Sequence, residues 1–455
     1  MITMYLREIA VSLDGELIGP GDILAQGVSI DSRTLIQGNV FVAIEGQNFD
    51  GHAFVLLAEQ MGAVGVIVQK KIDTRLTQII VANTKLALIE LAHQWRSKLS
   101  TTIVGVTGSN GKTTTKEMLA SILSVKGQVL FTQGNLNNEI GLPLTLLRLS
   151  PHHEYAVIEM GANHVGEIAY LSQCAMPDIA IITNVGAAHL EGFGDEKTIA
   201  KAKGEIFEAL SDHGIAILNA NDPYFKYWLG VIHQRKYLSF GLTSAADVYA
   251  ENNSFECDGK RFVTRFEIKT PKGSASVSLS LAGQHNVLNA LAATAASLSL
   301  GCSLNQIKQG LEVMKPISGR LELCRGRKGN LIINDVYNAN TSSLAAALEV
   351  LLECSGERWV VLGAFGELGA ESERLHSEMA ITLKKAGVTR LFALGEQTQL
   401  TVNAFGEYAQ HFASHQLLLE TLMPLLQGTE TLLIKGSRAQ RMEKITAALV
   451  ETTGF

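Results

Sequence analysis

The most constraining feature of this chain is residues 102–115, which read TIVGVTGSNGKTTT. The apolar run predicts a buried strand, a glycine-rich turn follows, and residues 116–123 are typical of a helix. Glycines allow positive φ, so several backbone N–H groups can point at one anion, and a helix N-terminus adds its positive dipole end. The pattern predicts a phosphate-binding loop. We expect its nucleotide-binding residues to be Gly108, Ser109, Asn110, Gly111, Lys112, Thr113 and Thr114.

Two side chains of this loop suit nucleotide chemistry. Lys112 would reach the β- and γ-phosphates of ATP, and the Thr113 hydroxyl would bind Mg²⁺. The strict motif has glycine five positions before Gly111, where this chain has Val106. The alternative interpretation is an ordinary glycine turn between a strand and a helix.

Composition narrows the class of protein. A length of 455 residues predicts two to four domains. The net charge of −6, without a run of lysine and arginine, argues against a nucleic-acid binder. Five scattered cysteines form no CxxC motif, which favours free thiols in a reducing compartment. Neither a signal peptide nor a run of ~20 apolar residues is present, so we expect a cytoplasmic protein without membrane insertion.

Residues 1–82 have the pattern of a small α/β domain, with expected strands at residues 39–44, 64–68 and 79–82. A polar cluster, Asp31-Ser32-Arg33-Thr34, precedes them. An arginine beside hydroxyl groups suits a phosphate or diphosphate, whereas Asp and Ser are equally typical of a turn or a helix N-cap. The residues alone leave both interpretations open.

Residues 83–315 have the pattern of a central domain in which polar groups follow predicted strands. Glu159 ends an apolar strand, and a carboxylate at the C-terminal end of a parallel strand is a candidate Mg²⁺ ligand. His189 follows the next strand, in the same layer as Lys112. The loop at residues 134–141 has glycine at both ends, which is typical of a ligand loop or of a plain connection.

Two predicted helices carry further candidates. Lys197, Lys201 and Lys203 lie on one helix, where a run of charge is normally a solvated face without function. Asn286 and Asn289 stand at positions i and i+3, so their amides could bind a purine edge. The alternative for Asn286 is capping of the helix.

Alternation over residues 248–281 predicts antiparallel strands, and residues 316–455 alternate strands, polar turns and helices again. Four strands are expected there, at residues 331–334, 359–362, 391–394 and 432–434. The fold class is therefore α/β. It comprises a small N-terminal domain (1–82), a central P-loop-type ATPase domain with a mostly parallel sheet (83–315) and a Rossmann-like C-terminal domain (316–455).

These motifs together resemble the ATP-dependent Mur ligases of peptidoglycan synthesis. The TGSNGKT loop indicates the superfamily, and NNEIG, AHLEGFG and YNAN indicate the branch that adds D-alanyl-D-alanine. The DNPR motif of the branch that adds the third amino acid is absent. The resemblance covers nearly the whole chain. The matching stretches lie at residues 31–34, 41–52, 107–115, 134–147, 159–162, 184–194, 202–207, 283–293, 319–320, 334–340, 366–369 and 435–438.

The resemblance implies roles for individual residues. Lys203 would be carbamylated by CO₂ and would bind a second Mg²⁺ with His189, while Glu159 and Thr113 would hold the first. Asn286 and Asn289 would face the adenine, with Arg320 and Asp335 near the ribose and phosphates. The implied substrate residues are Asp31, Ser32, Arg33, Asn137, Asn138 and Glu139 for the UDP-muramoyl-tripeptide, and Tyr337, Asn338, Asn340, Lys435 and Arg438 for the dipeptide.

The implied activity is amide formation through an acyl phosphate, with Lys112, Glu159, His189 and Lys203 as catalytic residues. It would join D-alanyl-D-alanine to UDP-N-acetylmuramoyl-tripeptide at the expense of ATP. We expect a monomer whose C-terminal domain closes over the central one, with hinges near residues 83 and 315. Two alternatives remain: another amide ligase of the superfamily, amino-acid-adding or folylpolyglutamate type, and a P-loop ATPase switch.

Overall fold

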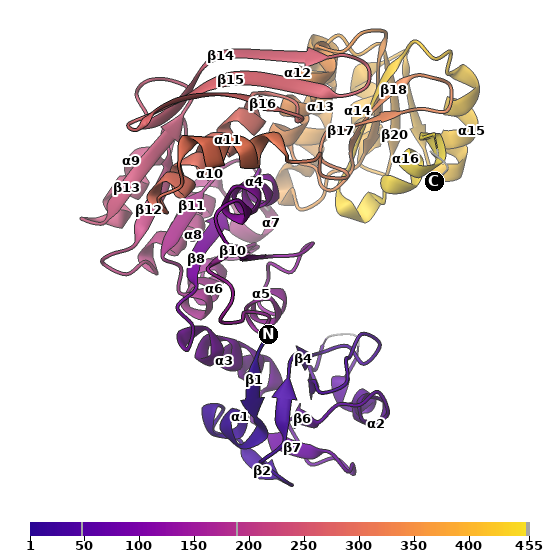
Figure 1. Cartoon of the computed structure of the whole chain (residues 1–455). Coiled ribbons are helices and arrows are strands. Elements are labelled where there is room, and N and C mark those ends of the chain that lie inside the picture. The colour runs from indigo at the N-terminus through magenta and orange to yellow at the C-terminus, as the bar shows by residue number, and fades with distance from the viewer. Residues whose placement is uncertain (47–48, 188–189, 452–455) are drawn as a thin grey trace.

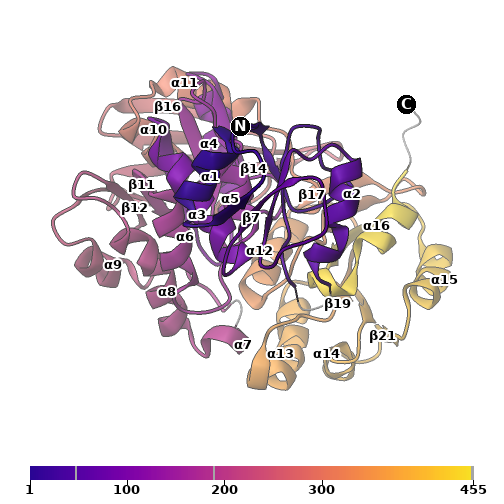
Figure 2. The same cartoon turned by 90° about the horizontal axis from the view of Figure 1, so that it is seen from below.

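The computed structural model describes residues 1–46, 49–187 and 190–451, which form three α/β units, each built on its own sheet (Figure 1). The first unit lies at the bottom of Figure 1, the central unit above it and the third unit at the upper right. Seen from below, the central and third units lie side by side, with the first unit in front (Figure 2).

The first unit has a five-stranded sheet in the order β2-β7-β6-β5-β4, parallel except for β2, and a separate pair, β1 and β3. Its core strands β5 and β6 are buried throughout. The elements are β1 (Thr3–Tyr5), α1 (Leu6–Ser12), β2 (Glu16–Ile18), β3 (Leu24–Gln26), β4 (Val28–Ser29), β5 (Val40–Val42), η1 (Gly51–Phe54), α2 (Val55–Gln60), β6 (Gly65–Val68) and β7 (Thr77–Ile80).

The central unit has nine strands in the order β16-β15-β14-β13-β12-β11-β8-β10-β9, and β14 to β16 form the antiparallel edge. The strands are β8 (Thr102–Thr107), β9 (Val129–Phe131), β10 (Tyr155–Glu159), β11 (Ile179–Ile182), β12 (Ile215–Asn219), β13 (Lys236–Gly241), β14 (Val248–Cys257), β15 (Phe262–Thr270) and β16 (Gly273–Leu279). The helices are α3 (Thr84–Ser97), α4 (Lys112–Ser124), α5 (Gly141–Leu146), α6 (Glu167–Ala175), α7 (Leu190–Phe193), α8 (Glu196–Glu208), α9 (Phe225–Ile232), α10 (Gln284–Ser299) and α11 (Leu304–Glu312).

The third unit has six strands in the order β17-β18-β22-β19-β20-β21, with β17 alone antiparallel among the described pairs. The strands are β17 (Glu322–Arg325), β18 (Leu331–Asp335), β19 (Arg358–Gly363), β20 (Arg390–Leu394), β21 (Ala409–Phe412) and β22 (Thr431–Lys435). The helical segments are α12 (Thr341–Leu352), η2 (Gly369–Glu371), α13 (Ser372–Lys385), α14 (Thr398–Phe405), α15 (His415–Leu425), η3 (Arg438–Gln440) and α16 (Glu443–Leu449).

The central strands of the two larger sheets are mostly apolar up to their last residue, because helices cover both faces of these sheets. In β10, for example, all five residues are buried, including the terminal Glu159. The carboxyl ends of β8, β10 and β11 therefore meet at one edge of the central sheet, where loops carry the polar side chains. This arrangement confirms the predicted α/β class with three units.

Some sequence predictions were incomplete. The third sheet has two edge strands, β17 and β21, beyond the four predicted. The helix after the glycine loop starts at Lys112, four residues earlier than predicted, because Gly111 serves as its N-cap with φ 80°. None of the described helices is long and apolar enough to cross a membrane.

Candidate functional site

A cavity of about 630 Å³ lies between the central and third units. Its central-unit wall comes from the glycine loop, the loop at residues 137–139, the end of β10 and the start of α10. Its third-unit wall comes from residues 335–346, the loop at residues 366–368 and the end of β22. The two sheets thus place their polar loops against each other around one space.

The glycine loop has the geometry that the sequence predicted. Gly108 and Gly111 have φ of 150° and 80°, which side chains rarely tolerate. The Lys112 ammonium donates hydrogen bonds to the carbonyl oxygens of Gly108 and Ser109 at 2.7 and 3.2 Å. Burial lowers the pKa of Lys112, and the nearby Glu159 carboxylate opposes that shift. The loop therefore brings a cation and a helix N-terminus to the cavity wall.

Glu159 is held by one of its two carboxylate oxygens. Oε1 accepts a hydrogen bond from Asn137 Nδ2 at 2.8 Å, whereas Oε2 is buried and has no hydrogen-bond partner among the described residues. No group of three His, Cys, Asp or Glu side chains suited to a metal occurs in the described ranges. Glu159 and Thr113 line the cavity together, which suits Mg²⁺, because that ion commonly takes one or two protein oxygens plus phosphate and water.

The two asparagines of α10 lie beside the glycine loop. Asn289 Nδ2 donates to Asn286 Oδ1 at 3.0 Å, and Asn289 Oδ1 accepts from the Thr115 hydroxyl at 3.3 Å. Asn286 does not cap the helix, since Gly283 is the N-cap and the Asn286 amide donates back to the Ala282 carbonyl. The capping alternative was wrong, and both amides line the cavity.

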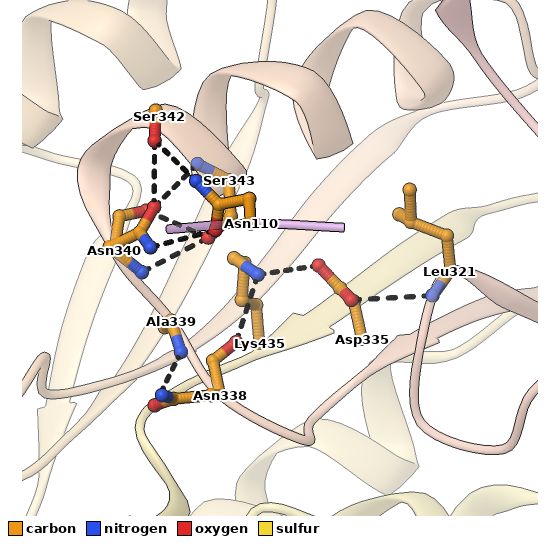
Figure 3. Close-up of polar contacts among 9 residues, drawn as sticks. All are labelled: Asn110, Leu321, Asp335, Asn338, Ala339, Asn340, Ser342, Ser343 and Lys435. Carbon is orange, nitrogen blue, oxygen red and sulfur yellow. Dashed lines mark hydrogen bonds and ion pairs between the residues drawn. The ribbon is translucent and has the colours of Figure 1, made fainter. Parts of the chain in front are cut away.

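Asn110 joins the glycine loop to the third unit (Figure 3). Its Oδ1 accepts a hydrogen bond from Asn340 Nδ2 at 2.8 Å, and its Nδ2 donates to Ser342 Oγ at 2.9 Å. Asn340 also caps α12, because its Oδ1 accepts the Ser343 N–H at 2.8 Å. A second contact between the units joins the Glu191 N–H to the Glu367 carbonyl at 3.0 Å. The glycine loop thus contacts the third unit directly.

Asp335 and Lys435 form an ion pair of 2.5 Å at the ends of neighbouring strands β18 and β22 (Figure 3). Lys435 Nζ also donates to the Asn338 carbonyl at 3.2 Å. Nearby, Arg320 lies over the Tyr337 ring, 4.0 Å from its centroid, and donates to the Thr113 hydroxyl at 2.8 Å. Residues predicted for the ribose, the metal and the dipeptide therefore contact one another.

His285 lines the cavity at the start of α10, and the sequence interpretation did not select it. Its Nδ1 is buried without a hydrogen-bond partner among the described residues. Desolvation lowers the pKa of His285 to about 4, against a smaller raising effect from Asp335, and Lys435 lowers it further. The ring is therefore neutral near pH 7.

Several predicted residues lie outside this cavity. Asp31, Ser32 and Arg33 form a turn in the first unit, where Arg33 pairs with Asp31 at 2.7 Å. Arg438 is exposed, near Glu443. His189 lies outside the described residues. The sequence predictions that line the cavity are Ser109 to Thr114, Asn137, Asn138, Glu139, Glu159, Asn286, Asn289, Arg320, Asp335, Tyr337, Asn338, Asn340 and Lys435.

Lys203 lies on α8 and is 2% exposed, so the solvated-face interpretation was wrong for this residue, although Lys197 and Lys201 are exposed. Within the described ranges it has no hydrogen-bond or ion-pair partner. Burial lowers the pKa of Lys203 well below its usual value, and repulsion from Lys112 adds to the shift.

Fold and site together define a class of protein: a three-unit α/β nucleotide-binding protein whose phosphate loop faces polar loops of a second sheet. Sequence profiles agree with this class. Residues 25–96 match the Mur ligase family catalytic domain, residues 106–297 the Mur ligase middle domain and residues 319–438 the Mur ligase glutamate ligase domain.

Individual proteins are similar over the whole length. The chain is 44% identical over 454 residues to the UDP-N-acetylmuramoyl-tripeptide--D-alanyl-D-alanine ligase of Escherichia coli K12, covering 99% of both chains. A crystal structure of MurF from Acinetobacter baumannii superimposes with a TM-score of 0.92 at 35% identity, covering 98% of this chain and 99% of that one. The MurF ligase of Thermotoga maritima in complex with ADP gives 0.82 at 30% identity, covering 93% and 96%. The chain belongs to the Mur ligase family.

Proposed function

We propose that this chain joins D-alanyl-D-alanine to UDP-N-acetylmuramoyl-tripeptide with hydrolysis of ATP, in the synthesis of peptidoglycan precursors. The support is full-length similarity to relatives named for that reaction, two of which are 44% and 33% identical to this chain. The observation that carries the proposal is the cavity in which the phosphate loop meets the polar loops of the third unit. ATP is the proposed nucleotide, in line with the ADP complex of the Thermotoga relative.

The reaction would proceed in two steps. The terminal carboxylate of the tripeptide attacks the γ-phosphorus of ATP, forming an acyl phosphate and releasing ADP. The amine of D-alanyl-D-alanine then attacks the acyl carbon, phosphate leaves with the C–O bond electrons, and the amine loses a proton. Both steps depend on charge neutralisation and positioning. Lys112 and the N-terminus of α4 would stabilise the phosphate charge.

Glu159 and Thr113 would hold a Mg²⁺ ion. The free, buried Oε2 of Glu159 fits a cation, and Thr113 lies on the same cavity wall. The ion would offset the charge of phosphate and carboxylate as they approach each other. Thr113 currently accepts a hydrogen bond from Arg320, so we expect that arginine to turn toward phosphate when nucleotide binds.

We also propose that Lys203 is carbamylated and takes part, with His189, in holding a second Mg²⁺. The support is a buried amine without a partner among the described residues and with a lowered pKa. A neutral amine adds to CO₂, forming a C–N bond and releasing one proton, and the product carries a carboxylate. A carbamate ¹³C resonance with ¹³C-bicarbonate, absent in Lys203→Ala, would test this modification.

We propose contacts for the UDP-muramoyl-tripeptide, for the dipeptide and for the nucleoside of ATP. Asp31, Ser32 and Arg33 would bind the UDP end, and Asn137, Asn138 and Glu139 would contact the muramoyl-tripeptide. Tyr337, Asn338, Asn340, Lys435 and Arg438 would meet the dipeptide, and Asn286, Asn289 and Asp335 would bind the nucleoside. The cavity wall contributed by the third unit would limit access of water to the acyl phosphate. We further propose a cytoplasmic monomer with domain limits near residues 83 and 315.

The test is phosphate release with ATP, Mg²⁺ and UDP-muramoyl-tripeptide, with and without D-alanyl-D-alanine, and product identification by mass spectrometry. Release that requires both substrates, with a product mass gain of one dipeptide less one water, supports the proposal. Release with a single amino acid instead would assign another ligase branch. Steady release without either acceptor would favour the ATPase switch.

A further inference from the structure

Lys116 is a buried lysine that the proposed mechanism does not use. It lies on α4, four residues after Lys112 and therefore on the same side of the helix, but it is fully buried. Its Nζ donates to the Thr132 carbonyl at 2.6 Å, pairs with Glu117 at 2.7 Å and lies 5.5 Å from the centroid of the Phe131 ring. Burying an ammonium is costly unless it is paired and hydrogen-bonded, so apolar packing alone does not account for a lysine here.

Thr132 is the residue that Lys116 holds, and it also contacts Glu159. It directly follows β9 and is fully buried. Its hydroxyl oxygen accepts the Glu159 N–H at 2.9 Å, while its own N–H donates to the Val157 carbonyl at 3.1 Å. One residue thus connects the helix that carries Lys112 and Thr113 to the backbone of the candidate metal ligand.

The chain that leaves Thr132 reaches the Glu159 side chain as well. Five residues later, Asn137 donates from Nδ2 to Glu159 Oε1 at 2.8 Å, and its carbonyl accepts the Gly161 N–H at 2.9 Å. Glu159 is therefore fixed at its backbone and at one carboxylate oxygen. The remaining oxygen, Oε2, is the one left free.

We propose that Lys116 and Thr132 are positioning residues that set where Glu159 presents Oε2 to a divalent cation. The inference rests on the proposed function, in which Glu159 holds that cation. Lys116 and Thr132 act through Glu159 and do not touch the reacting atoms. Partners of this kind typically change metal affinity 10- to 100-fold when they are removed.

The experiment is a titration of Mn²⁺, followed by electron paramagnetic resonance, on the full chain in the presence of ADP. Thr132→Val keeps the shape and loses the acceptor, whereas Thr132→Ser keeps the hydroxyl. We expect Thr132→Val and Lys116→Met to weaken Mn²⁺ binding about 10-fold or more. Thr132→Ser should bind Mn²⁺ like the unmodified chain. The matched control is Lys126→Met, which removes a lysine of similar type that follows the same helix and donates to the Leu300 carbonyl.

Glu159→Gln distinguishes the metal role of Glu159 from the positioning role of Lys116 and Thr132. If Glu159→Gln weakens Mn²⁺ binding while Thr132→Val and Lys116→Met bind like the unmodified chain, the positioning role is wrong and the metal role of Glu159 stands. If Glu159→Gln binds Mn²⁺ normally, the metal role of Glu159 and the positioning role of Lys116 and Thr132 are both wrong. If Lys126→Met weakens Mn²⁺ binding as much as Lys116→Met does, the loss is not specific to the contact with Thr132, and the inference is overturned. Should Lys116→Met fail to fold, the Thr132→Val and Thr132→Ser pair decides.

Discussion

Two ion pairs, one in the first unit and one in the third, were both predicted to bind ligands, and the structure places them in opposite environments. Asp31 and Arg33 were predicted for the UDP substrate, Asp335 for ATP and Lys435 for the dipeptide. Asp31 and Arg33 are 34% and 85% exposed at the side chain, whereas Asp335 and Lys435 are 13% and 1% exposed. The exposed pair lies in a turn, and the buried pair joins two neighbouring strands. Arg33 can exchange Asp31 for a ligand group at little cost. Lys435 and Asp335 line the cavity as a buried pair, and breaking that pair to bind a ligand would cost far more.

The largest effect should come from breaking the buried pair. Lys435→Met leaves the Asp335 carboxylate without its cation, and we expect a loss of about 3–5 kcal/mol in the stability of the third unit. Hydrogen exchange of the β18 and β22 amides measures it. The double variant Asp335→Asn/Lys435→Met should recover part of the loss, and a double variant as unstable as the sum of both single variants would contradict the pairing argument.

The second prediction concerns His285, which lies near the buried pair and should make the free energy of unfolding depend on pH. Its folded pKa of about 4 lies below the unfolded value of about 6.5, so the stabilising contribution is complete above pH 6.5 and is lost as pH falls toward 4. The difference in unfolding free energy between the chain and His285→Gln should shrink by at most about 3–4 kcal/mol over that range. Denaturation at stepwise pH measures it, with the exposed His213→Gln as control. A pH-independent difference would contradict the prediction.

A smaller loss of stability is expected at the contact between the central and third units. Asn110→Ala removes two hydrogen bonds to the third unit. Ser342→Ala removes one of these two, together with the bond that Ser342 Oγ donates to Asn340 Oδ1 inside the third unit. At about 1 kcal/mol for each bond, the contact between the units should weaken in steps. The radius of gyration from solution scattering should then rise more for Asn110→Ala than for Ser342→Ala. Equal values in both variants would show that other contacts hold the units together.

The exposed pair should give the smallest stability effect. Arg33→Ala should leave the thermal midpoint unchanged within error, while binding of the UDP substrate falls at least 10-fold if the proposed role is correct. Calorimetric titration measures the affinity, and Arg75→Ala, at another position of the same unit, is the control. Unchanged affinity would remove Arg33 from the proposed substrate site.

The predictable part of the fold was the part with long apolar runs. β8, β10 and β11 are continuous buried strands followed by polar turns, and this pattern survives in sequence. Strands of two to four residues, such as β4, β9 and β21, are too short for any periodicity to define them. Their existence depends on neighbours that complete their hydrogen bonds.

The residues of the candidate site likewise divide into those that the sequence could predict and those that it could not. Residues of the glycine loop and Glu159 could be predicted because each follows a strand at a fixed offset. His285 and Lys116 could not, since a single histidine or a lysine within a helix is usually unremarkable until its burial is known. The contact between Asn110 and Asn340 spans 230 residues of sequence and depends entirely on how two sheets face each other.

The strand order of the third sheet has a consequence for biosynthesis. β22 is the last strand in sequence, yet it lies between β18 and β19 in the middle of the sheet. While a ribosome is still making residues before 431, β18 and β19 cannot join into one sheet, although the first unit already has all its strands by residue 80. The third unit must therefore assemble after nearly the whole chain has been made, and a nascent chain should show protease-resistant first and central units before a resistant third one.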